Sequence, residues 1–154
     1  GIYETGIEIF GALDDLWLKK DTEEIVVLDY KATSTKNLED YTTSKKHYHV
    51  SYRRQLDFYA YLLKLNDFKV HDTGYWLICN ATDGEQKTFN KTVNFKTTLL
   101  SYKLNTDYIE DSLVDLKACL DSNKYPSSGQ DCDNCRWYNE KKKLGETIRL
   151  NIEK

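Results

Sequence analysis

The sequence lacks methionine altogether, contains a single proline and has no long apolar run. No stretch approaches the roughly 18 apolar residues that span a membrane, so we expect no membrane segment. No signal-peptide pattern is visible either. Because methionine is absent, Gly1 is not expected to be a native start, and the chain is interpreted as an excised fragment, a processed chain or one with a tag remnant.

Cysteine is scarce, with only Cys79, Cys119, Cys132 and Cys135. The four do not read as a disulfide framework, so a reducing, cytoplasmic compartment is expected. Cys79 lies in an apolar run and Cys119 in an expected helix, where cysteine behaves as a small buried hydrophobe. The pair Cys132 and Cys135 supplies only two of the four ligands of a structural zinc site, which argues against a zinc-ribbon protein.

The remaining composition is that of one ordinary globular domain, with 154 residues, 40% hydrophobic and 31% charged. The net charge of −3 argues weakly against unspecific nucleic-acid binding. Six basic and two acidic residues lie between Lys31 and Arg54, whereas five acidic residues and one lysine lie between Asp107 and Asp121. This polarity suits a polyanion on one side, although a solvated loop beside a solvated helix fits it equally.

A short apolar run from Ile25 to Leu28 ends in Asp29-Tyr30-Lys31. Consecutive β-branched and aliphatic residues bounded by charge predict a buried central strand. Side chains alternate along a strand, so Asp29 and Lys31 are expected on one face and Tyr30 on the other. A divalent metal on the carboxylate would explain why a buried strand carries these charges, although a salt-bridged strand end fits the same pattern.

A strand is also predicted from Ile7 to Leu18, with a bulge or a close backbone approach at Gly11. The polar turn Lys19 to Glu24 would join it to the strand Ile25 to Lys31 as an antiparallel hairpin.

This hairpin would bring Asp14 near Asp29, with Asp15 as the neighbouring alternative. Two carboxylates at one strand end repel each other unless a cation lies between them. Sequence spacing alone barely separates the two candidates.

A long polar, basic loop is predicted from Ala32 to Val50, and loops of this length are uncommon unless they are functional or mobile. His47 and His49 lie in it. They are interpreted either as solvated side chains or as ligand contacts.

A helix is predicted from Ser51 to Leu65, with Gln55 and Tyr59 four residues apart on one face. Arg53 and Arg54 fall at its expected N-terminal end, where positive charge adds to a terminus that attracts anions. The apolar stripe of this helix recurs at helical spacing and contains Tyr52, Leu56, Tyr59, Ala60 and Leu63.

The later elements complete an α/β pattern, a mixed central β-sheet flanked by helices. The whole chain, residues 1–154, is expected to form one domain with residues 126–154 as its cysteine-containing tail. The remaining predicted segments are strands at Thr73 to Ala81 and Lys91 to Lys103, a turn at Asp83-Gly84, and helices at Asp107 to Asn123 and Arg136 to Lys154.

Three motifs follow one another in the chain: Gly11-Ala-Leu-Asp14, Asp29-Tyr30-Lys31 and Gln55-Leu-Asp-Phe-Tyr59. In this order they resemble the PD-(D/E)XK nuclease superfamily, and within it the RecB-like branch. Pro126 and Cys132-x-x-Cys135 resemble the C-terminal cysteine region of its members. The resemblance covers roughly Ile7 to Tyr138 and implies a restriction-endonuclease-like core.

The resemblance implies a metal site and a catalytic lysine. Asp14 and Asp29 would ligate one or two Mg²⁺ or Mn²⁺ ions, helped by the Tyr30 carbonyl. Lys31 would orient or activate the attacking water and stabilise charge on the scissile phosphate. These roles agree with what phosphodiester hydrolysis requires, and oxygen ligands suit Mg²⁺ or Mn²⁺ better than zinc.

The resemblance also implies that Gln55 and Tyr59 line the site and contact DNA or ordered waters. Basic residues on the same side of the chain are expected to contact the DNA backbone. These are Lys36, Lys45, Lys46, Arg53 and Arg54.

Two features depart from the family pattern. RecB-like nucleases usually carry a further acid or histidine on an upstream helix, which is expected to be absent or cut away here. Glu4 and Glu8 are the available substitutes, but neither is chosen as a ligand. The iron–sulfur members use one early and three late cysteines. Only Cys132 and Cys135 lie late in this chain and none precedes Cys79, so an intact iron–sulfur cluster is not expected.

The leading interpretation is a metal-dependent DNA nuclease domain, exonuclease-like, in repair or recombination, as part of a longer chain or with a helicase partner. The alternative is a catalytically incomplete nucleic-acid-binding or scaffolding domain of the same fold. Retention of Asp14, Asp29 and Lys31 favours the enzyme. The short N-terminus and the acidic net charge favour the alternative.

Overall fold

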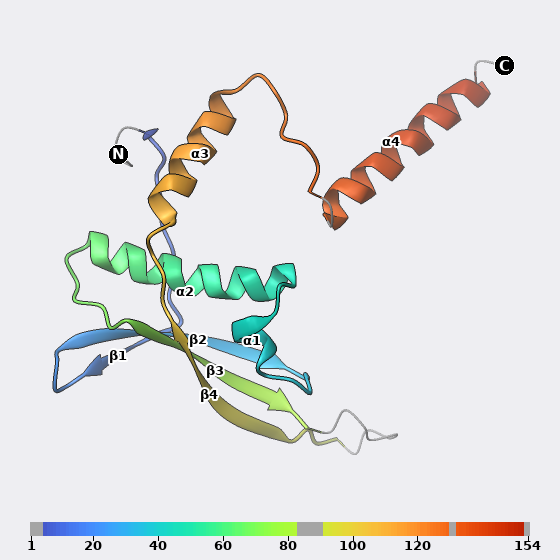
Figure 1. The fold of residues 1–154 in the computed structure, drawn as a ribbon. Helices are drawn as coiled ribbons and strands as arrows, with labels where there is room; N and C mark the ends of the chain where they lie inside the picture. Colours follow the sequence, from blue (N-terminus) through green and yellow to red (C-terminus); the bar gives the residue numbers. More distant parts are fainter. Residues whose placement is uncertain (1–4, 83–90, 130–131, 153–154) are drawn as a thin grey trace. The chain divides into compact units, whose positions relative to one another are not determined.

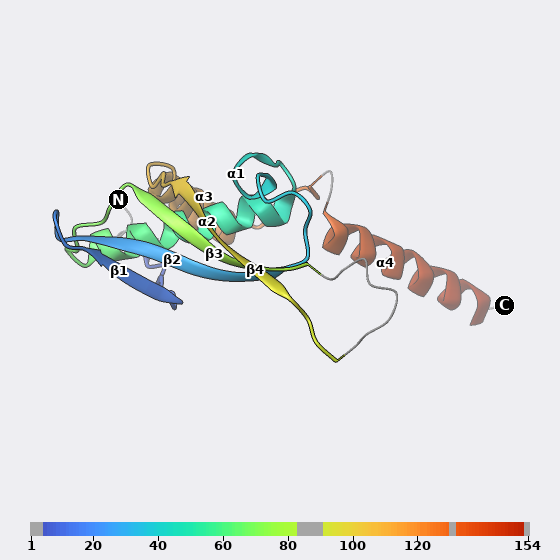
Figure 2. The same ribbon diagram turned by 90° about the horizontal axis from the view of Figure 1, so that it is seen from below.

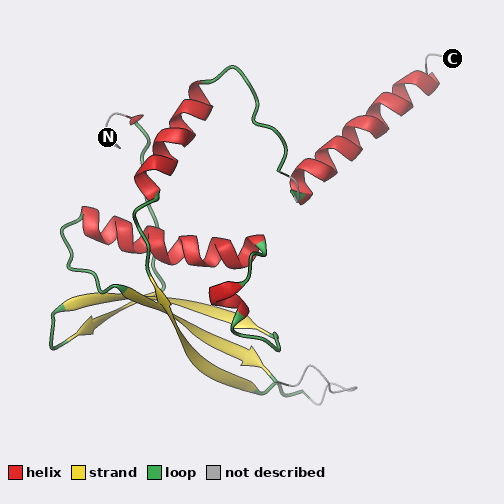
Figure 3. Cartoon of the chain, viewed as in Figure 1, coloured by secondary structure: helices red, strands yellow, loops and turns green. Residues whose placement is uncertain are grey.

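The computed structural model describes residues 5–82, 91–129 and 132–152. Figure 1 shows the order of the helices and strands, and Figure 3 distinguishes them by type. In chain order they are β1 (Asp15–Lys19), β2 (Glu24–Thr33), α1 (Asp40–Thr43), α2 (His47–Leu65), β3 (Thr73–Ala81), β4 (Phe95–Lys103), α3 (Ile109–Asp121) and α4 (Asp133–Ile152).

The four strands form one mixed sheet in the order β1-β2-β3-β4. β1 and β2 make the predicted antiparallel hairpin, β2 and β3 run parallel, and β3 and β4 run antiparallel. Parallel neighbours need a crossover connection, and α1 and α2 supply it between β2 and β3. Sheet and helices together confirm the predicted fold class.

The hydrophobic core lies between α2 and one face of the sheet. Val27 of β2 and Trp76 and Ile78 of β3 are fully buried there against Leu56 and Ala60 of α2. This pattern confirms the apolar stripe predicted for the helix, apart from Tyr52, which is only partly buried. Figure 2 shows the sheet from the side away from α2.

The chain divides into two compact units, Gly1–Val114 and Asp115–Lys154, with the boundary inside α3. The sheet, α1 and α2 all belong to the first unit, whereas α4 belongs to the second. The expectation of a single domain over residues 1–154 stays a prediction. None of the helices in the described parts of the chain is both long enough and apolar enough to cross a membrane.

The first strand is shorter than predicted, because β1 begins at Asp15 and not at Ile7. Residues 7–13 run outside the sheet, and Gly11 lies against the side chains of Tyr59 and Leu62 in α2. The segment therefore packs against the helix before it joins the sheet. The close backbone approach expected at Gly11 is confirmed, but its partner is a helix.

The prediction of one long loop from Ala32 to Val50 is wrong, because more than half of these residues belong to a strand or a helix. β2 continues to Thr33, α1 occupies Asp40–Thr43, and α2 begins at His47 instead of Ser51. Lys46, the residue before α2, makes no side-chain capping bond, so the usual sequence signal for a helix start is missing. The first turn instead packs against α1, where the ring of His49 lies 5.2 Å from the ring of Tyr41.

Smaller differences affect the later elements. β4 starts at Phe95 and not Lys91, α3 covers Ile109–Asp121 within the predicted range, and α4 starts at Asp133 and not Arg136. These shifts are typical of element ends, which fray and have weak local signals. The turn predicted at Asp83-Gly84 lies outside the described residues.

Candidate active site

The hairpin places two carboxylates on the face of the sheet that α2 covers. Asp15, the first residue of β1, pairs with Leu28 in the strand register, so Asp14, directly before β1, lies beside Asp29. The Asp14 carboxylate accepts a 2.8 Å hydrogen bond from the backbone N–H of Tyr30, which ties it to β2. Asp14 is exposed, whereas Asp29 is 1% exposed.

Asp15 belongs to the opposite face of the sheet. It accepts hydrogen bonds from the Tyr30 hydroxyl at 2.5 Å and from the Trp17 indole N–H at 3.2 Å. The Tyr30 hydrogen bond is the main reason that the pKa of Asp15 lies below its usual value. Because Tyr30 points away from Asp29 on β2, the structure brings Asp14, and not Asp15, to Asp29.

Lys31 pairs with Asp29 on the same face of β2. Its ammonium lies 2.5 Å from Asp29 Oδ2, and both side chains are largely buried, with 17% and 1% exposure. The lysine ammonium also lies 4.7 Å from the centre of the Tyr52 ring, a distance at which the aromatic face attracts a cation. The alternation that the sequence predicted for Asp29, Tyr30 and Lys31 is confirmed.

A line of hydrogen bonds joins β2 to α2. The Lys31 ammonium donates to Gln55 Oε1 at 3.0 Å, and Gln55 Nε2 donates to the Tyr59 hydroxyl at 2.9 Å. Gln55 and Tyr59 are one turn apart on α2, as their spacing predicted. The polar line therefore runs from Asp29 through Lys31 and Gln55 to Tyr59.

Burial raises the pKa of Asp29 above its usual value and is the largest influence on it. The Lys31 ammonium opposes this shift, because it favours the ionised carboxylate. Asp14 raises the pKa further, through its charge and through a hydrogen bond between the two carboxyl groups, which requires a proton on one of them. Without a metal cation between them, the two carboxylates therefore repel each other, and this repulsion disfavours ionisation of both at once.

A divalent cation fits this pair of carboxylates. Apart from the ion pair with Lys31, Asp29 Oδ2 has no hydrogen-bond partner among the described residues. Two oxygen ligands suffice for an ion such as Mg²⁺, which keeps several waters. No group of three or more His, Cys, Asp or Glu side chains gathers in the described ranges.

Three further candidate ligands stay predictions. Glu8 is exposed, as Asp14 is, and Glu4 lies outside the described residues. The Tyr30 N–H is bonded to Asp14, and metal ligation by the Tyr30 carbonyl stays a prediction.

His49 is not a loop residue, because it lies in the first turn of α2 with 5% exposure. Its ring is 5.2 Å from Tyr41 and 4.3 Å from Tyr48, measured between ring centres. Burial lowers the pKa of His49, which favours the neutral ring. His47 is exposed at the start of the same helix. His49 is therefore a packing residue.

The five predicted DNA-binding basic residues differ in their contacts, and their role in binding DNA stays a prediction. The Arg53 guanidinium donates 2.7 Å hydrogen bonds to the carbonyls of Tyr41 and Ser44, so it anchors α1 to α2. Arg54 is exposed, and its charge acts on Tyr108, near the start of α3. The other three predicted residues, Lys36, Lys45 and Lys46, are exposed.

Asp57 is a buried charge that sequence reasoning missed. It is 2% exposed and accepts hydrogen bonds from the Asn105 N–H at 2.8 Å, the Tyr102 hydroxyl at 3.2 Å and the Tyr108 hydroxyl at 3.1 Å. Burial raises the pKa of Asp57, and burial together with Asp57 raises the pKa of Tyr102 to about 12. The available signal was its place on the helix. Asp57 lies two residues from both Gln55 and Tyr59, so helical spacing puts this acid on the other side of α2.

The family model described as the PD-(D/E)XK nuclease superfamily matches residues 2–139. The chain belongs to this superfamily. Searches of curated proteins and of solved structures gave no match. Membership in the PD-(D/E)XK superfamily confirms the family predicted from the three motifs, whereas the RecB-like branch and the role of each residue stay predictions.

Proposed function

We propose that this PD-(D/E)XK domain is a metal-dependent nuclease that hydrolyses phosphodiester bonds in DNA. The observation that carries the proposal is the continuous polar line of Asp29, Lys31, Gln55 and Tyr59, with Asp14 at its open end. Superfamily membership supports nuclease chemistry, and the three ordered motifs support a RecB-like, exonuclease-like role in repair or recombination.

Asp14 and Asp29 would hold Mg²⁺ or Mn²⁺, which supplies charge neutralisation at the phosphate and an acidified water. Their own contribution is positional. Asp29 is fixed by burial in β2, and Asp14 is fixed by the Tyr30 N–H. A carboxyl group must lose its proton before it binds a metal ion. Because the pKa of Asp29 is raised, Asp29 keeps its proton to a higher pH than an ordinary carboxyl group does.

Lys31 would provide the positive charge beside the scissile phosphate. Three contacts orient it: the Asp29 carboxylate, Gln55 Oε1 and the Tyr52 ring. Such a preorganised cation stabilises charge that develops in the transition state without reorganising during the reaction. Gln55 and Tyr59 then serve as supports that keep the lysine in place and present polar atoms to DNA or ordered water.

DNA would approach over α1 and the first turns of α2. Lys45 and Lys46 are exposed there and can contact phosphates. Arg53 would act indirectly, because its guanidinium already holds the carbonyls of Tyr41 and Ser44. A helicase, or another domain of a longer chain, would act together with this domain. The four free cysteines suit a reducing, cytoplasmic setting.

The second candidate is a catalytically incomplete domain that binds nucleic acid or acts as a scaffold. One observation favours it. In the described residues, only two acids converge at the site, and Lys31 already neutralises one of them. Such a domain would bind DNA with or without a divalent cation.

The metal proposal is tested by calorimetric titration of Mn²⁺ into the parent chain, Asp29→Asn and Asp15→Asn. Asp15 is a matched control, since it is one residue from Asp14 but on the other face of the sheet. We expect Asp29→Asn to lose Mn²⁺ binding by at least tenfold, about 1.4 kcal/mol, and Asp15→Asn to keep parental affinity.

Affinity should also fall as the pH is lowered, starting above the range of an ordinary carboxylate, because the pKa of Asp29 is raised. Equal Mn²⁺ affinity in the parent and Asp29→Asn would remove the metal site and favour the binding-domain candidate.

A further inference from the structure

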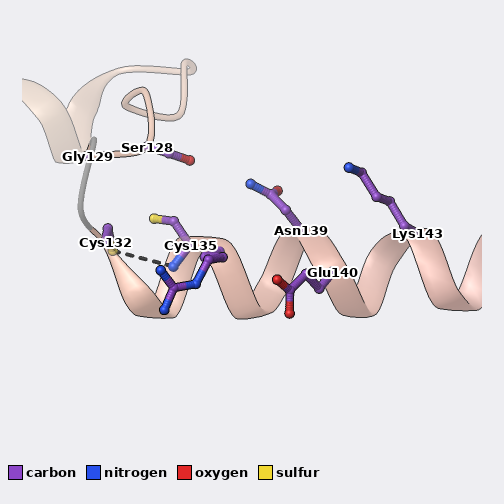
Figure 4. Close-up of a pocket in the computed structure, with 8 residues that line it drawn as sticks. Ser128, Gly129, Cys132, Cys135, Asn139, Glu140 and Lys143 are labelled. Atoms are coloured by element: carbon purple, nitrogen blue, oxygen red, sulfur yellow. Dashed lines mark hydrogen bonds between the residues drawn. The ribbon is translucent and has the colours of Figure 1, made fainter.

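The second unit carries a cysteine pair that the nuclease proposal does not use. Cys132 directly precedes α4, and Cys135 lies in its first turn. Both line an open pocket of about 350 Å³, shown in Figure 4. Asn139 and Lys143 follow one and two turns further along the same helix face.

The backbone fixes Cys132 at the start of the helix. Its carbonyl accepts a 3.0 Å hydrogen bond from the Arg136 N–H, and its own N–H donates to the Gly129 carbonyl at 3.2 Å. Its sulfur accepts a 3.4 Å hydrogen bond from the backbone N–H of Cys135. The Cys132 sulfur therefore caps α4, in the place where an N-cap oxygen usually accepts.

We propose that Cys132 and Cys135 form a thiol–disulfide exchange site that reacts with small disulfides of the glutathione type. A sulfur that accepts a backbone N–H at the positive end of a helix is stabilised as the thiolate, which is the nucleophilic form. The partner thiol is three residues away and lines the same pocket, where it can resolve a mixed disulfide.

Electrostatics around the sulfur support this geometry. The Cys135 backbone N–H is the largest influence lowering the pKa of Cys132, and the Cys135 side chain and the Asn134 N–H lower it further. The Asp133 carboxylate opposes them. Asp133 is itself paired with Arg136, and the pocket also contains Glu140 and Lys143, so both signs of charge face the site.

The reaction balances with the disulfide as the oxidant. The Cys132 thiolate attacks one sulfur of RS–SR, that bond breaks, and the released RS⁻ takes up a proton. Cys135 gives up its proton and attacks the Cys132 sulfur of the mixed disulfide, which releases the second RSH. Two protein thiols lose two electrons, one RS–SR becomes two RSH, and a Cys132–Cys135 disulfide forms.

The site is tested on the full, reduced chain by incubation with oxidised glutathione, an acid quench and alkylation with a maleimide. Trypsin releases residues 125–136, which contain only these two cysteines, separately from Cys119 in residues 118–124. We expect residues 125–136 to lose two hydrogens and to resist alkylation, while exposed Cys119 remains alkylated.

Two variants separate the roles. Cys135→Ser should accumulate one glutathione on Cys132, because the resolving thiol is gone. Cys132→Ser should leave Cys135 as slow to react as Cys119. At pH 7 an ordinary thiol is only ~3% ionised, so Cys132 should alkylate several-fold faster than such a thiol, up to the roughly 30-fold that full ionisation permits.

Three results would overturn the proposal. In the first, the peptide of residues 125–136 takes up two maleimides after treatment with oxidised glutathione, the same number as in the untreated chain. Cys132 could alkylate no faster than Cys119. Both thiols could resist alkylation until a chelator removes a bound metal, which would make the pair a metal ligand instead.

Discussion

Asp29 is a buried carboxylate whose folded environment favours the protonated form. Its pKa is raised on folding, so the folded chain keeps a proton at pH values where the unfolded chain has lost it. Stability from this group is therefore present at acidic pH and falls as the pH rises through the raised pKa. Functional sites often accept such a loss.

Asp29→Asn is accordingly expected to be at least as stable as the parent at pH 7 without metal, and to lose this advantage near pH 3, where the parent is protonated. Thermal unfolding of both chains from pH 3 to 8 measures the difference. Asp57 titrates in the same direction but is common to both, so it cancels. A variant clearly less stable at pH 7 would show that the Lys31 ion pair outweighs burial.

Asp57 links α2 to the segment that follows β4. Asp57→Ala leaves three donors without their acceptor, the Asn105 N–H and the hydroxyls of Tyr102 and Tyr108. We expect a loss of about 2–4 kcal/mol in unfolding free energy, measured by urea denaturation. Asp57→Asn keeps one oxygen and should lose about half as much. A loss below about 0.5 kcal/mol for alanine would mean that water satisfies these donors.

At the scale of elements, Gly11 sets how closely the segment before β1 approaches α2. A Cβ added at Gly11 would lie 3.1 Å from both Leu62 Cδ1 and Tyr59 Cε1. The Tyr59 ring would have to move, and its hydroxyl is the last acceptor in the line from Lys31. Close packing against Tyr59 and Leu62 therefore gives a physical reason for a glycine at this position of the first motif.

Gly11→Ala should destabilise the chain by about 1 kcal/mol, and Gly11→Val by about 1–3 kcal/mol, since overpacking increases with side-chain volume. Urea denaturation of the two variants gives the series. If neither variant loses stability, the segment or the two side chains move aside easily, and the close approach at Gly11 does not require glycine.

The sequence predicted the elements whose signals are local and periodic. The strand ending in Asp29-Tyr30-Lys31, the apolar stripe of α2 and the hairpin all follow from alternation or helical spacing. It failed where distant contacts decide. The start of α2 depends on Arg53 and on Tyr41 of α1, and neither contact has a signature in the residues near His47.

The candidate site shows the same division. Strand alternation was enough to put Asp29 and Lys31 on one face, but it could not choose between Asp14 and Asp15. The choice between Asp14 and Asp15 depends on the register of β1 against β2. In the structure Asp15 shares a face with Tyr30, whose hydroxyl donates to it, and Asp14 is left on the face of Asp29. Asp57 was missed because its three donors come from residues about fifty positions later.

At the scale of the whole molecule, superfamily membership accounts for the sheet and for α2, which carry the candidate site. The family match ends at residue 139, early in α4. The cysteine pair lies in the second unit, Asp115–Lys154, and still within the matched residues. The two proposals therefore rest on separate units and can fail independently.

The most direct test of the central claim compares DNA cleavage with DNA affinity in the parent chain, Lys31→Ala and Lys45→Ala. Lys45 is an exposed lysine outside the polar line and serves as the matched control. Cleavage of linear DNA in Mn²⁺ and gel-shift affinity are measured at one salt concentration. A lysine that acts on transition-state charge affects rate more than binding.

We expect Lys31→Ala to cleave roughly 10²–10³-fold more slowly, about 3–4 kcal/mol. Its DNA affinity should stay within about tenfold of the parent, a window of about 1.4 kcal/mol. Lys45→Ala should cleave at nearly the parental rate and bind only modestly more weakly. A Lys31→Ala chain that cuts as fast as the parent would contradict this site, and a parent that cuts no nucleic acid in Mg²⁺ or Mn²⁺ would contradict the enzyme.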